Sequence, residues 1–471
     1  MNYKNGEAQA MNPNILLIVM DATRARNLSC YGYERTTTPN LDRLAASGVL
    51  YEQAITSAGW SLPAHASLFT GLYASRHGAD DQHKYLEPEH LSLAEILSAR
   101  GYHTLAFCEN PYVGPATGLD RGFQWFNRSF QSSAQPIFKK AEKFKRKLRN
   151  AMAKAQGEHD SGAANINRRV LESLRRMKDE SKPFFMFMHY EDTHAPYRLP
   201  KSFARFLPQG VDLRQALQVN QDPWQYLIDP KKMQETDFEI LRALYDSELY
   251  YVDYRIGQVL DELKAMRVLD NTMVIVTADH GENIGDHGMM AHKYCLYDTL
   301  MHVPFIVHYP KGMTNPGRVP YQVQTLDLVP TILSMLGETA SDLFRSLQGY
   351  DLLSAQRRDF TIAEQSRPDL QKFYTRFPGV DVSRFDRALT MIRDDHYKYI
   401  WASDGKHELY DRIADPDEQH NLIPTLASVA AKLQDRLDHW KNGFMPAKPS
   451  APAPEFDQEV VERLQALGYL E

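Results

Sequence analysis

Cysteine is scarce in this sequence, with three residues among 471: Cys30, Cys108 and Cys295. Their odd number and wide spacing exclude a closed disulfide framework and a zinc finger, and favour free thiols in a reducing compartment. Long apolar runs are missing as well, since the polar opening segment has no secretion-signal core and residues 15–20 are too few to cross a bilayer. We therefore expect a cytoplasmic protein without a transmembrane segment.

A strong charge of one sign is also absent, because the formal net charge is only -6. Such a chain has no global field to attract nucleic acid, so we expect no nucleic-acid partner and a local pocket for any anionic ligand. Hydrophobic residues make up 43% of the chain, which is enough for a sizeable core. The length exceeds what one core usually serves, so we expect a large domain with a smaller appendage.

Three apolar segments are each followed at once by acidic residues and histidines. They are NILLIVM at residues 14–20, PFFMFMH at 183–189 and TMVIVT at 272–277. Continuous apolar and β-branched runs of this length are typical of central strands in a parallel sheet that is covered on both faces. Helical patterns lie between them, for example at 166–177 and 238–266. The sequence therefore predicts an α/β/α sandwich with a mostly parallel central sheet.

Asp21, Asp279 and His280 directly follow the first and third of these segments. The carboxyl ends of parallel strands share one edge of a sheet, where open α/β proteins bind ligands. Carboxylate oxygens joined by an imidazole suit a divalent cation, either calcium or a manganese or zinc ion. An aspartate at a strand end is weak support when taken alone, so the set of residues has to be judged together.

The segment GWSLPAHASLFTG, residues 59–71, places a serine two positions before a proline and a helical pattern. A proline in the first turn predicts that Ser61 lies at a helix N-terminus, where backbone N–H groups attract anions. The alternative is that Ser61 is a plain N-terminal cap, which base rates favour for a serine considered in isolation.

In their order along the chain, these segments resemble the sulfatase branch of the alkaline-phosphatase superfamily. The matching segments are NILLIVMDATRARNLSCYGY, TPNLDRLAASGVLYEQA, WSLPAHASLFTGLYASRHG, FFMFMHYEDTHAPY, VIVTADHGENIGDHG, AHKYCLYD, VPFIVHYP, LDLVPTILSMLG and ELYDRIADPDEQHNL. The resemblance implies an alkaline-phosphatase-like fold and a metal-dependent hydrolase whose substrates are small anionic esters of sulfate or phosphate.

The resemblance also implies a metal site. Asp21, Asp279 and His280 would hold one divalent ion, and Ser61 would be the nucleophile with its oxygen on the same ion. Two features depart from the family, which usually has a second aspartate where this chain has Ala22 and often has asparagine where it has His280. The first change removes an anionic ligand, and His280 makes the site less typical of calcium.

On the substrate side, the resemblance implies that Lys293 and His194 contact the ester oxygens, and either could assist departure of the leaving group. His65 is a further catalytic candidate. Candidates for substrate binding are Arg24, Asp192 and His292. Asp192, His194 and His292 also match, in residue type, the extra ligands of two-metal relatives, so a second ion is an alternative to direct hydrogen bonding.

The nucleophile motif differs from that of ordinary sulfatases, which carry Cys-x-Pro-x-Arg or Ser-x-Pro-x-Arg and oxidise the first residue to formylglycine. Here it reads Ser61-Leu-Pro-Ala-His65. We therefore expect Ser61 to stay a serine. A serine-bound intermediate must be cleared by water attacking phosphorus or sulfur, which favours phosphate mono- or diesters or phosphonates. A formylglycine-type sulfatase is the alternative if Ser61 is modified.

The chain is predicted to divide into a tail at residues 1–13, a catalytic domain at 14–380 and a small α+β subdomain at 381–471. The catalytic domain carries a basic insertion at 130–163, with lysines and arginines crowded at 139–154. Such a segment could contact a membrane or an acidic partner, and the alternative is a solvated cap near the site.

Two other classes of protein compete with the hydrolase. A head-group phosphoryl transferase of the same superfamily is usually tethered by N-terminal membrane helices, which this sequence lacks. A non-catalytic binding protein would be favoured by loss of Asp21, Asp279 or Lys293, and all three are present. The sequence is compatible with a homo-oligomer and contains no readable code for the organic part of the substrate.

Overall fold

The computed structural model describes residues 3–4, 7–8, 12–128, 158, 160–178, 180–447 and 456–466. The crowded basic residues of the predicted insertion, 139–154, lie outside this described part. In the described part, no helix combines the length and the apolar character needed to cross a membrane.

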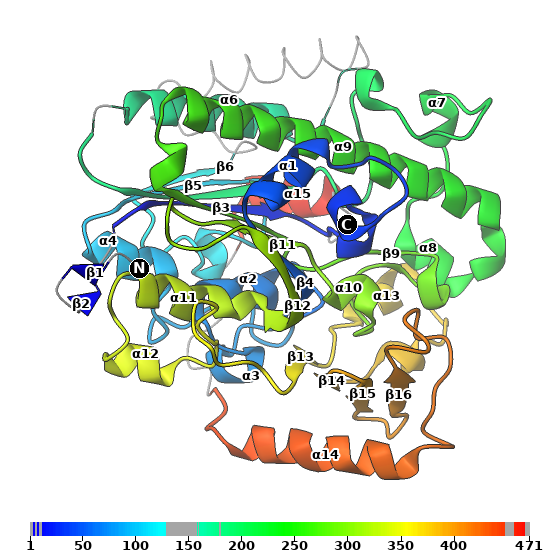
Figure 1. The fold of residues 1–471 in the computed structure, drawn as a ribbon. Helices are drawn as coiled ribbons and strands as arrows, with labels where there is room; N and C mark the ends of the chain where they lie inside the picture. The colour runs from blue at the N-terminus through cyan, green and yellow to red at the C-terminus, as the bar shows by residue number, and fades with distance from the viewer. Residues whose placement is uncertain are drawn as a thin grey trace.

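An eight-stranded sheet forms the centre of the molecule (Figure 1), in the order β12-β4-β11-β8-β3-β7-β5-β6. Its strands are β3 (Asn14–Met20), β4 (Val49–Ile55), β5 (His103–Cys108), β6 (Trp125–Arg128), β7 (Phe184–Tyr190), β8 (Thr272–Thr277), β11 (Phe305–His308) and β12 (Gly317–Gln324). Within this sheet β11 runs antiparallel to β4 and β8, whereas the other neighbouring pairs are parallel. The predicted mostly parallel sheet is thus confirmed.

The first apolar segment, β3, shows why the central strands are apolar on both faces. Because successive side chains of a strand point to opposite faces, Leu16 and Ile18 belong to one core cluster and Leu17 and Val19 to the other. β7 and β8 flank β3 and are equally buried. Helices therefore cover both faces of the sheet.

The helices form two layers around this sheet (Figure 1). On one face lie α1 (Pro39–Ser47), α6 (Ala163–Arg176) and α9 (Glu235–Ala265), and on the other lie α2 (Ser61–Thr70), α4 (Leu93–Ala99) and α11 (Leu328–Met335). The helices predicted at 166–177 and 238–266 correspond to α6 and α9. Shorter helices in the connecting segments are α3 (Ala74–His77), α7 (Leu213–Ala216), α8 (Pro223–Ile228), α10 (Asp298–Met301), α12 (Asp342–Ser346) and α13 (Gln371–Arg376).

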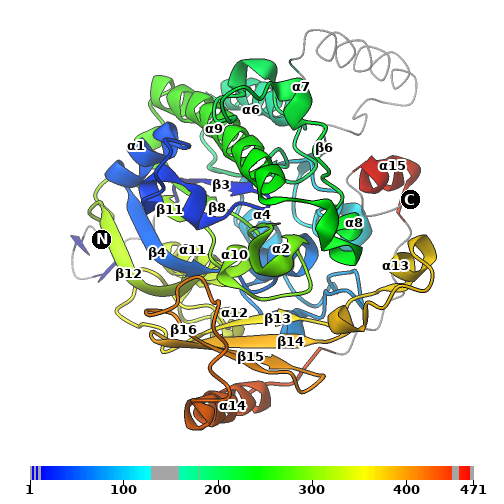
Figure 2. The same cartoon turned by 90° about the vertical axis from the view of Figure 1, so that its right-hand side faces the viewer.

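A second, antiparallel sheet lies beside the large one, with α14 (Ala427–Asn442) packed on it (Figure 2). Its strands are β13 (Thr361–Gln365), β14 (Leu389–Arg393), β15 (Tyr397–Ala402) and β16 (Glu408–Asp411). This confirms a small α+β unit, and its first strand precedes the boundary predicted at residue 381. The division into domains stays a prediction, because the last helix, α15 (Gln458–Ala466), packs against the core of the large sheet.

Two-residue strands complete the described structure. β1 (Tyr3–Lys4) pairs with β2 (Glu7–Ala8), and β9 (Asn283–Ile284) pairs with β10 (Met290–Ala291). The second pair follows Asp279 and His280 and leads directly to His292 and Lys293. It therefore folds the substrate-side residues back toward the predicted metal ligands.

Candidate active site and metal centre

Asp21, Asp279 and His280 meet at the carboxyl edge of the large sheet. β3 and β8 are paired in parallel with Val19 opposite Thr277, so the residues that follow these positions emerge at the same edge. The backbone N–H of Ala22 donates to Asp279 Oδ1 at 3.2 Å. Asp21, Asp279 and His280 each offer one ligand atom, and these atoms lie within 4.8 Å of one another.

Ser61 is the first residue of α2 and is almost fully buried, at 1% exposure. Its side chain does not cap the helix, since the N-cap position is held by Trp60. Instead Ser61 Oγ lies 3.4 Å from His280 Nε2. The helix N-terminus thus presents the hydroxyl to the two acids and the imidazole from the sheet edge.

The donor set fits a divalent cation. His280 Nε2 lies 3.4 Å from Asp279 Oδ2 and 3.7 Å from Asp21 Oδ1, and both of these buried carboxylate oxygens lack a hydrogen-bond partner among the described residues. Burying unpaired charge is costly, and a cation is the ordinary way to offset it. His280 Nδ1 lies 2.8 Å from the carbonyl oxygen of Gly281, an arrangement that leaves Nε2 to act as a ligand.

Electrostatics at the centre agree with this arrangement. Burial and the nearby Asp279 raise the pKa of Asp21 to about 8. Two carboxylates this close cannot both ionise in a dry interior without a positive charge beside them. The backbone is also strained here, since Ala22 and Lys293 adopt left-handed φ values of 51° and 80°.

Asn110 is a site residue that sequence reasoning missed. Its Nδ2 donates to Asp21 Oδ2 at 2.7 Å and to Ser61 Oγ at 3.0 Å. It follows β5, so the rule that located Asp21 and Asp279 at strand ends could have found it. An amide at this point orients both the first acid and the hydroxyl.

Two histidines lie on the interior side of the centre. His65 Nδ1 lies 2.8 Å from the carbonyl oxygen of Ser61 and 3.6 Å from Asp279 Oδ2, and burial lowers the pKa of His65 to about 4. His189, read from the sequence as a core strand residue, places Nε2 3.2 Å from Asp21 Oδ2. The two rings are 5.2 Å apart, so His65 supports the centre from behind alongside His189.

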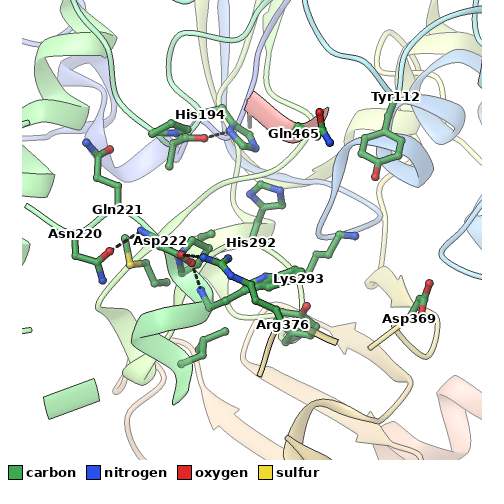
Figure 3. A pocket seen from close by; sticks show the side chains of 18 of the residues that line it. Tyr112, His194, Asn220, Gln221, Asp222, His292, Lys293, Asp369, Arg376 and Gln465 are labelled. Atoms are coloured by element: carbon green, nitrogen blue, oxygen red, sulfur yellow. Dashed lines mark hydrogen bonds and ion pairs between the residues drawn. The ribbon is translucent and has the colours of Figure 1, made fainter. Parts of the chain in front are cut away.

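A cavity of about 950 Å³ lies next to this centre, and His194, His292 and Lys293 line it (Figure 3). The ring of His292 is 4.3 Å from that of His280 and 4.8 Å from that of His194. His292 therefore joins the cavity to the predicted metal ligands. Lys293 Nζ lies 3.3 Å from Asp81 Oδ1 and 4.0 Å from the centre of the Trp60 ring.

The cavity histidines are uncharged near neutral pH. Burial lowers the pKa of His194 to about 3 and that of His292 well below its usual value, and His280 acts in the same direction on both. His194 Nδ1 is hydrogen-bonded to the carbonyl oxygen of Ala195, and His292 Nδ1 lies 3.3 Å from Glu282 Oε1. Two neutral rings can thus face an anion together with one ammonium group.

Arg24 and Asp192, which are both predicted to bind substrate, do not line the cavity. Arg24 forms a buried ion pair with Asp286 at 2.9 Å. Asp192 accepts hydrogen bonds from the backbone of Ser161 at 3.0 Å and Ala163 at 3.1 Å, where α6 begins. Arg24 is thus paired with an acid, and Asp192 is bound to the N-terminal backbone of a helix.

The predicted ligand set for a second metal is not assembled. Among the described residues, Asp192, His194 and His292 do not form a group whose ligand atoms lie close enough to share one ion. Each group whose ligand atoms are close enough contains two of the residues Asp21, Asp279 and His189.

Comparisons with known proteins agree with the fold. The sulfatase family model matches residues 13–338, and a model described as N-sulphoglucosamine sulphohydrolase, C-terminal, matches residues 285–443. The uncharacterized sulfatase YidJ of Escherichia coli K12 is 26% identical over 450 residues, covering 90% of this chain and 86% of that protein. Arylsulfatase K of Bos taurus is 24% identical over 458 residues, covering 90% and 81%.

A solved structure shares the architecture as well. The phosphonate monoester hydrolase of Agrobacterium radiobacter superposes with a TM-score of 0.72 at 21% identity, covering 95% of this chain and 100% of that chain. At this identity the likeness shows the fold, which is that of alkaline-phosphatase-like sulfatases. With the family match spanning the sheet and the residues gathered at its edge, the chain belongs to the sulfatase family and is a hydrolase that acts on ester bonds.

Proposed function

We propose that this protein is a metal-dependent hydrolase of phosphate or sulfate esters that uses unmodified Ser61 as its nucleophile. The observation that carries the proposal is the meeting of Asp21, Ser61, Asp279 and His280, with two buried carboxylate oxygens that have no hydrogen-bond partner among the described residues. These four side chains would hold one divalent ion. An imidazole ligand and the absence of a second aspartate after Asp21 favour manganese or zinc over calcium.

When bound, the ion would acidify the serine hydroxyl and offset charge on the transferred group. The chain itself prepares Ser61 for attack. Asn110 donates to Oγ and fixes its direction, and the N-terminus of α2 stabilises negative charge on the same oxygen. Almost complete burial of Ser61 keeps bulk water away from the nucleophile.

The cavity side supplies the groups that bind and release the ester. Lys293 would contact the non-bridging oxygens, and Asp81 holds its ammonium group over the ring of Trp60. The Nδ1 atom of His194 is held by the carbonyl oxygen of Ala195, and this ring would assist departure of the leaving group. His292, adjacent to His280, would hydrogen-bond a further ester oxygen.

The intact serine favours phosphorus over sulfur as the atom attacked. A formylglycine hydrate can expel sulfate by re-forming its carbonyl, whereas a serine ester must be cleared by a second attack of water. His65 stands where ordinary sulfatases have the arginine of their modification motif. We therefore propose phosphate mono- or diesters, or phosphonate monoesters, ahead of sulfate esters.

A panel of 4-nitrophenyl sulfate, phosphate, phosphodiester and phenylphosphonate, each assayed with calcium, manganese and zinc, tests the proposal. We expect phosphorus esters to be turned over faster than the sulfate, with manganese or zinc. The intact mass of the protein should show no loss of two hydrogens at Ser61. Fast sulfate hydrolysis together with that loss would establish the formylglycine mechanism instead.

A further inference from the structure

The C-terminal helix α15 lies beside the active-site cavity, apart from the helix that precedes it. Figure 2 shows α15 on the side of the molecule where α8 and α13 lie, away from α14. Val460 and Leu464 of α15 are fully buried and belong to the same core cluster as Leu62 of the nucleophile helix. The helix follows residue 443, where the second family match ends.

An aromatic chain connects this C-terminal segment to the nucleophile. Phe456, just before α15, meets the ring of Tyr112 edge-to-face at 6.0 Å. Tyr112 in turn meets the ring of Trp60 edge-to-face at 5.4 Å, and Trp60 directly precedes Ser61. Tyr112 also lines the cavity, so the C-terminal segment supports one of its walls.

Arg463 anchors α15 at the start of α6. Its Nη2 donates to the carbonyl oxygen of Ser161 at 3.1 Å, and the backbone N–H of Ser161 donates to Asp192 at 3.0 Å. Burial raises the pKa of the neighbouring Glu109 well above its usual value, and Arg463 acts against this rise. The guanidinium thus brings positive charge to buried carboxylates next to the site, which fixes the helix in place.

Gln465, two residues further on, reaches the cavity itself. Figure 3 shows its side chain at the rim near His194, on the same side as Tyr112 and facing the space above Lys293. The cavity of about 950 Å³ is far larger than a tetrahedral anion requires. Its remaining lining includes Trp224 and Leu227, which suits an organic group rather than a second anion.

We propose that α15 forms one wall of a subsite for the organic part of the ester, with Gln465 and Tyr112 contacting a flat aromatic or similarly apolar group. Arg463 acts as a positioning residue that holds this wall. The inference rests on the proposed function in one respect, because the anionic end of the ligand is placed at Lys293 and the metal centre. Tyr112 lines the cavity, and aromatic rings favour contact with other flat apolar groups.

Two phosphonates without an ester bond test the subsite without any turnover. Methylphosphonate and 1-naphthylphosphonate share the anionic end and differ in the organic group, and calorimetric titration of the manganese-loaded protein gives both affinities. We expect the wild type to prefer the naphthyl compound. Gln465→Ala should weaken naphthylphosphonate binding about fivefold and leave methylphosphonate binding unchanged.

Arg463→Ala should reproduce this selective loss, and Arg463→Lys should restore part of it. Gln458→Ala is the matched control, since Gln458 is an exposed glutamine of the same helix that does not line the cavity. We expect it to bind both probes as the wild type does.

Equal affinities of the wild type for the two probes would overturn the subsite, as would an unchanged naphthyl preference in Gln465→Ala and Arg463→Ala. The ester panel judges the proposed function separately. A wild type that prefers naphthylphosphonate but hydrolyses no ester would end the proposed function and retain the subsite. Ester hydrolysis without a preference for naphthylphosphonate would retain the proposed function and end the subsite.

Discussion

At the scale of single residues, the two acids and the imidazole of the centre lie close enough to share one cation. Asp21 Oδ1 and Asp279 Oδ2 have no hydrogen-bond partner among the described residues, and His280 Nε2 lies near both. His65 Nδ1 is 3.6 Å from Asp279 Oδ2, but burial lowers the pKa of His65 to about 4, so this ring adds no charge there near neutral pH. Loss of one acid should therefore affect the ion before it affects the fold.

Asp279→Ala should lose bound metal and lower kcat by about a thousandfold. This is the upper end of the usual loss in kcat when one group that stabilises the transition state electrostatically is removed. Metal content by mass spectrometry and turnover of the best ester measure the two effects. Asp270→Ala is a suitable control, because Asp270 is an acid of the same region whose side chain is 73% exposed. Full turnover and full metal content in Asp279→Ala would contradict the ligand assignment.

Asn110→Ala should retain the metal and lower kcat by about ten- to a hundredfold. The variant removes the donor shared by Asp21 Oδ2 and Ser61 Oγ, so the hydroxyl loses its orientation while the ligands stay. Steady-state kinetics with a parallel metal assay would separate these effects. A matching fall in metal content would show that Asn110 acts on the ion and not on the nucleophile.

The residues of the centre differ in how far the sequence could predict them. Asp21, Ser61, Asp279 and His280 follow apolar strands or begin a helix, so local pattern places them at one edge. His189 and Arg24 could not be judged in this way, because their roles depend on neighbours distant in sequence. His189 faces Asp21 from an adjacent strand, and Arg24 is engaged by Asp286.

At the scale of elements, one ion-pair cluster joins α10 of the large domain to the small sheet. Asp298, the first residue of α10, lies 2.8 Å from Lys398 Nζ on β15 and 3.3 Å from Arg393 Nη2 on β14. Lys398 is fully buried. Although burial opposes ionisation, Arg393 and Lys398 hold the pKa of the Asp298 carboxyl well below its ordinary value of 3.8.

Because the folded-state pKa of Asp298 is lowered, its stabilising effect is present above pH 3.8 and is lost as the pH falls below that value. Asp298→Asn should therefore lower the free energy of unfolding by about 3 kcal/mol at neutral pH, as expected for breaking a buried pair. The difference from wild type should shrink on acidification. The midpoints of urea unfolding between pH 3 and 7 measure this difference. Asp342→Asn is the control, because the side chain of Asp342 is 98% exposed. A deficit that is constant with pH would exclude the ion pair as its source.

Local pattern predicted the central strands and the long helices, but it did not predict where the last elements pack. The small sheet begins with β13, which precedes the expected boundary. The pattern of such a short strand does not reveal which strand it pairs with, so the sequence does not show where this sheet begins. α15 has an apolar face that could equally cover the small sheet. Only the positions of Val460 and Leu464 in the large core show which surface it covers.

At the scale of the whole molecule, the predicted metal ligands come from segments separated by most of the catalytic domain. Removing the ion should therefore loosen β3, β8 and α2 together. With a metal concentration of 100 to 1,000 times Kd, binding stabilises a folded protein by about 3 to 4 kcal/mol. A chelator should lower Tm by several degrees.

Calorimetry with and without chelator measures this shift, and re-addition of manganese or zinc should reverse it. Asp279→Ala should give the same low Tm in both conditions. If neither chelator nor added metal changed the Tm of the wild type, the ion would make no structural contribution.

The placement of β3 also bears on how the chain is made. β3 precedes both of its partners in the finished sheet, which are β7, at residues 184–190, and β8, at residues 272–277. Until β7 has been synthesised this apolar strand has two unpaired edges, and until β8 follows it has one, which is a state prone to wrong pairing. The nascent protein thus needs shielding at β3 over this span, and the acids and the imidazole of the centre can meet only once His280 has been synthesised.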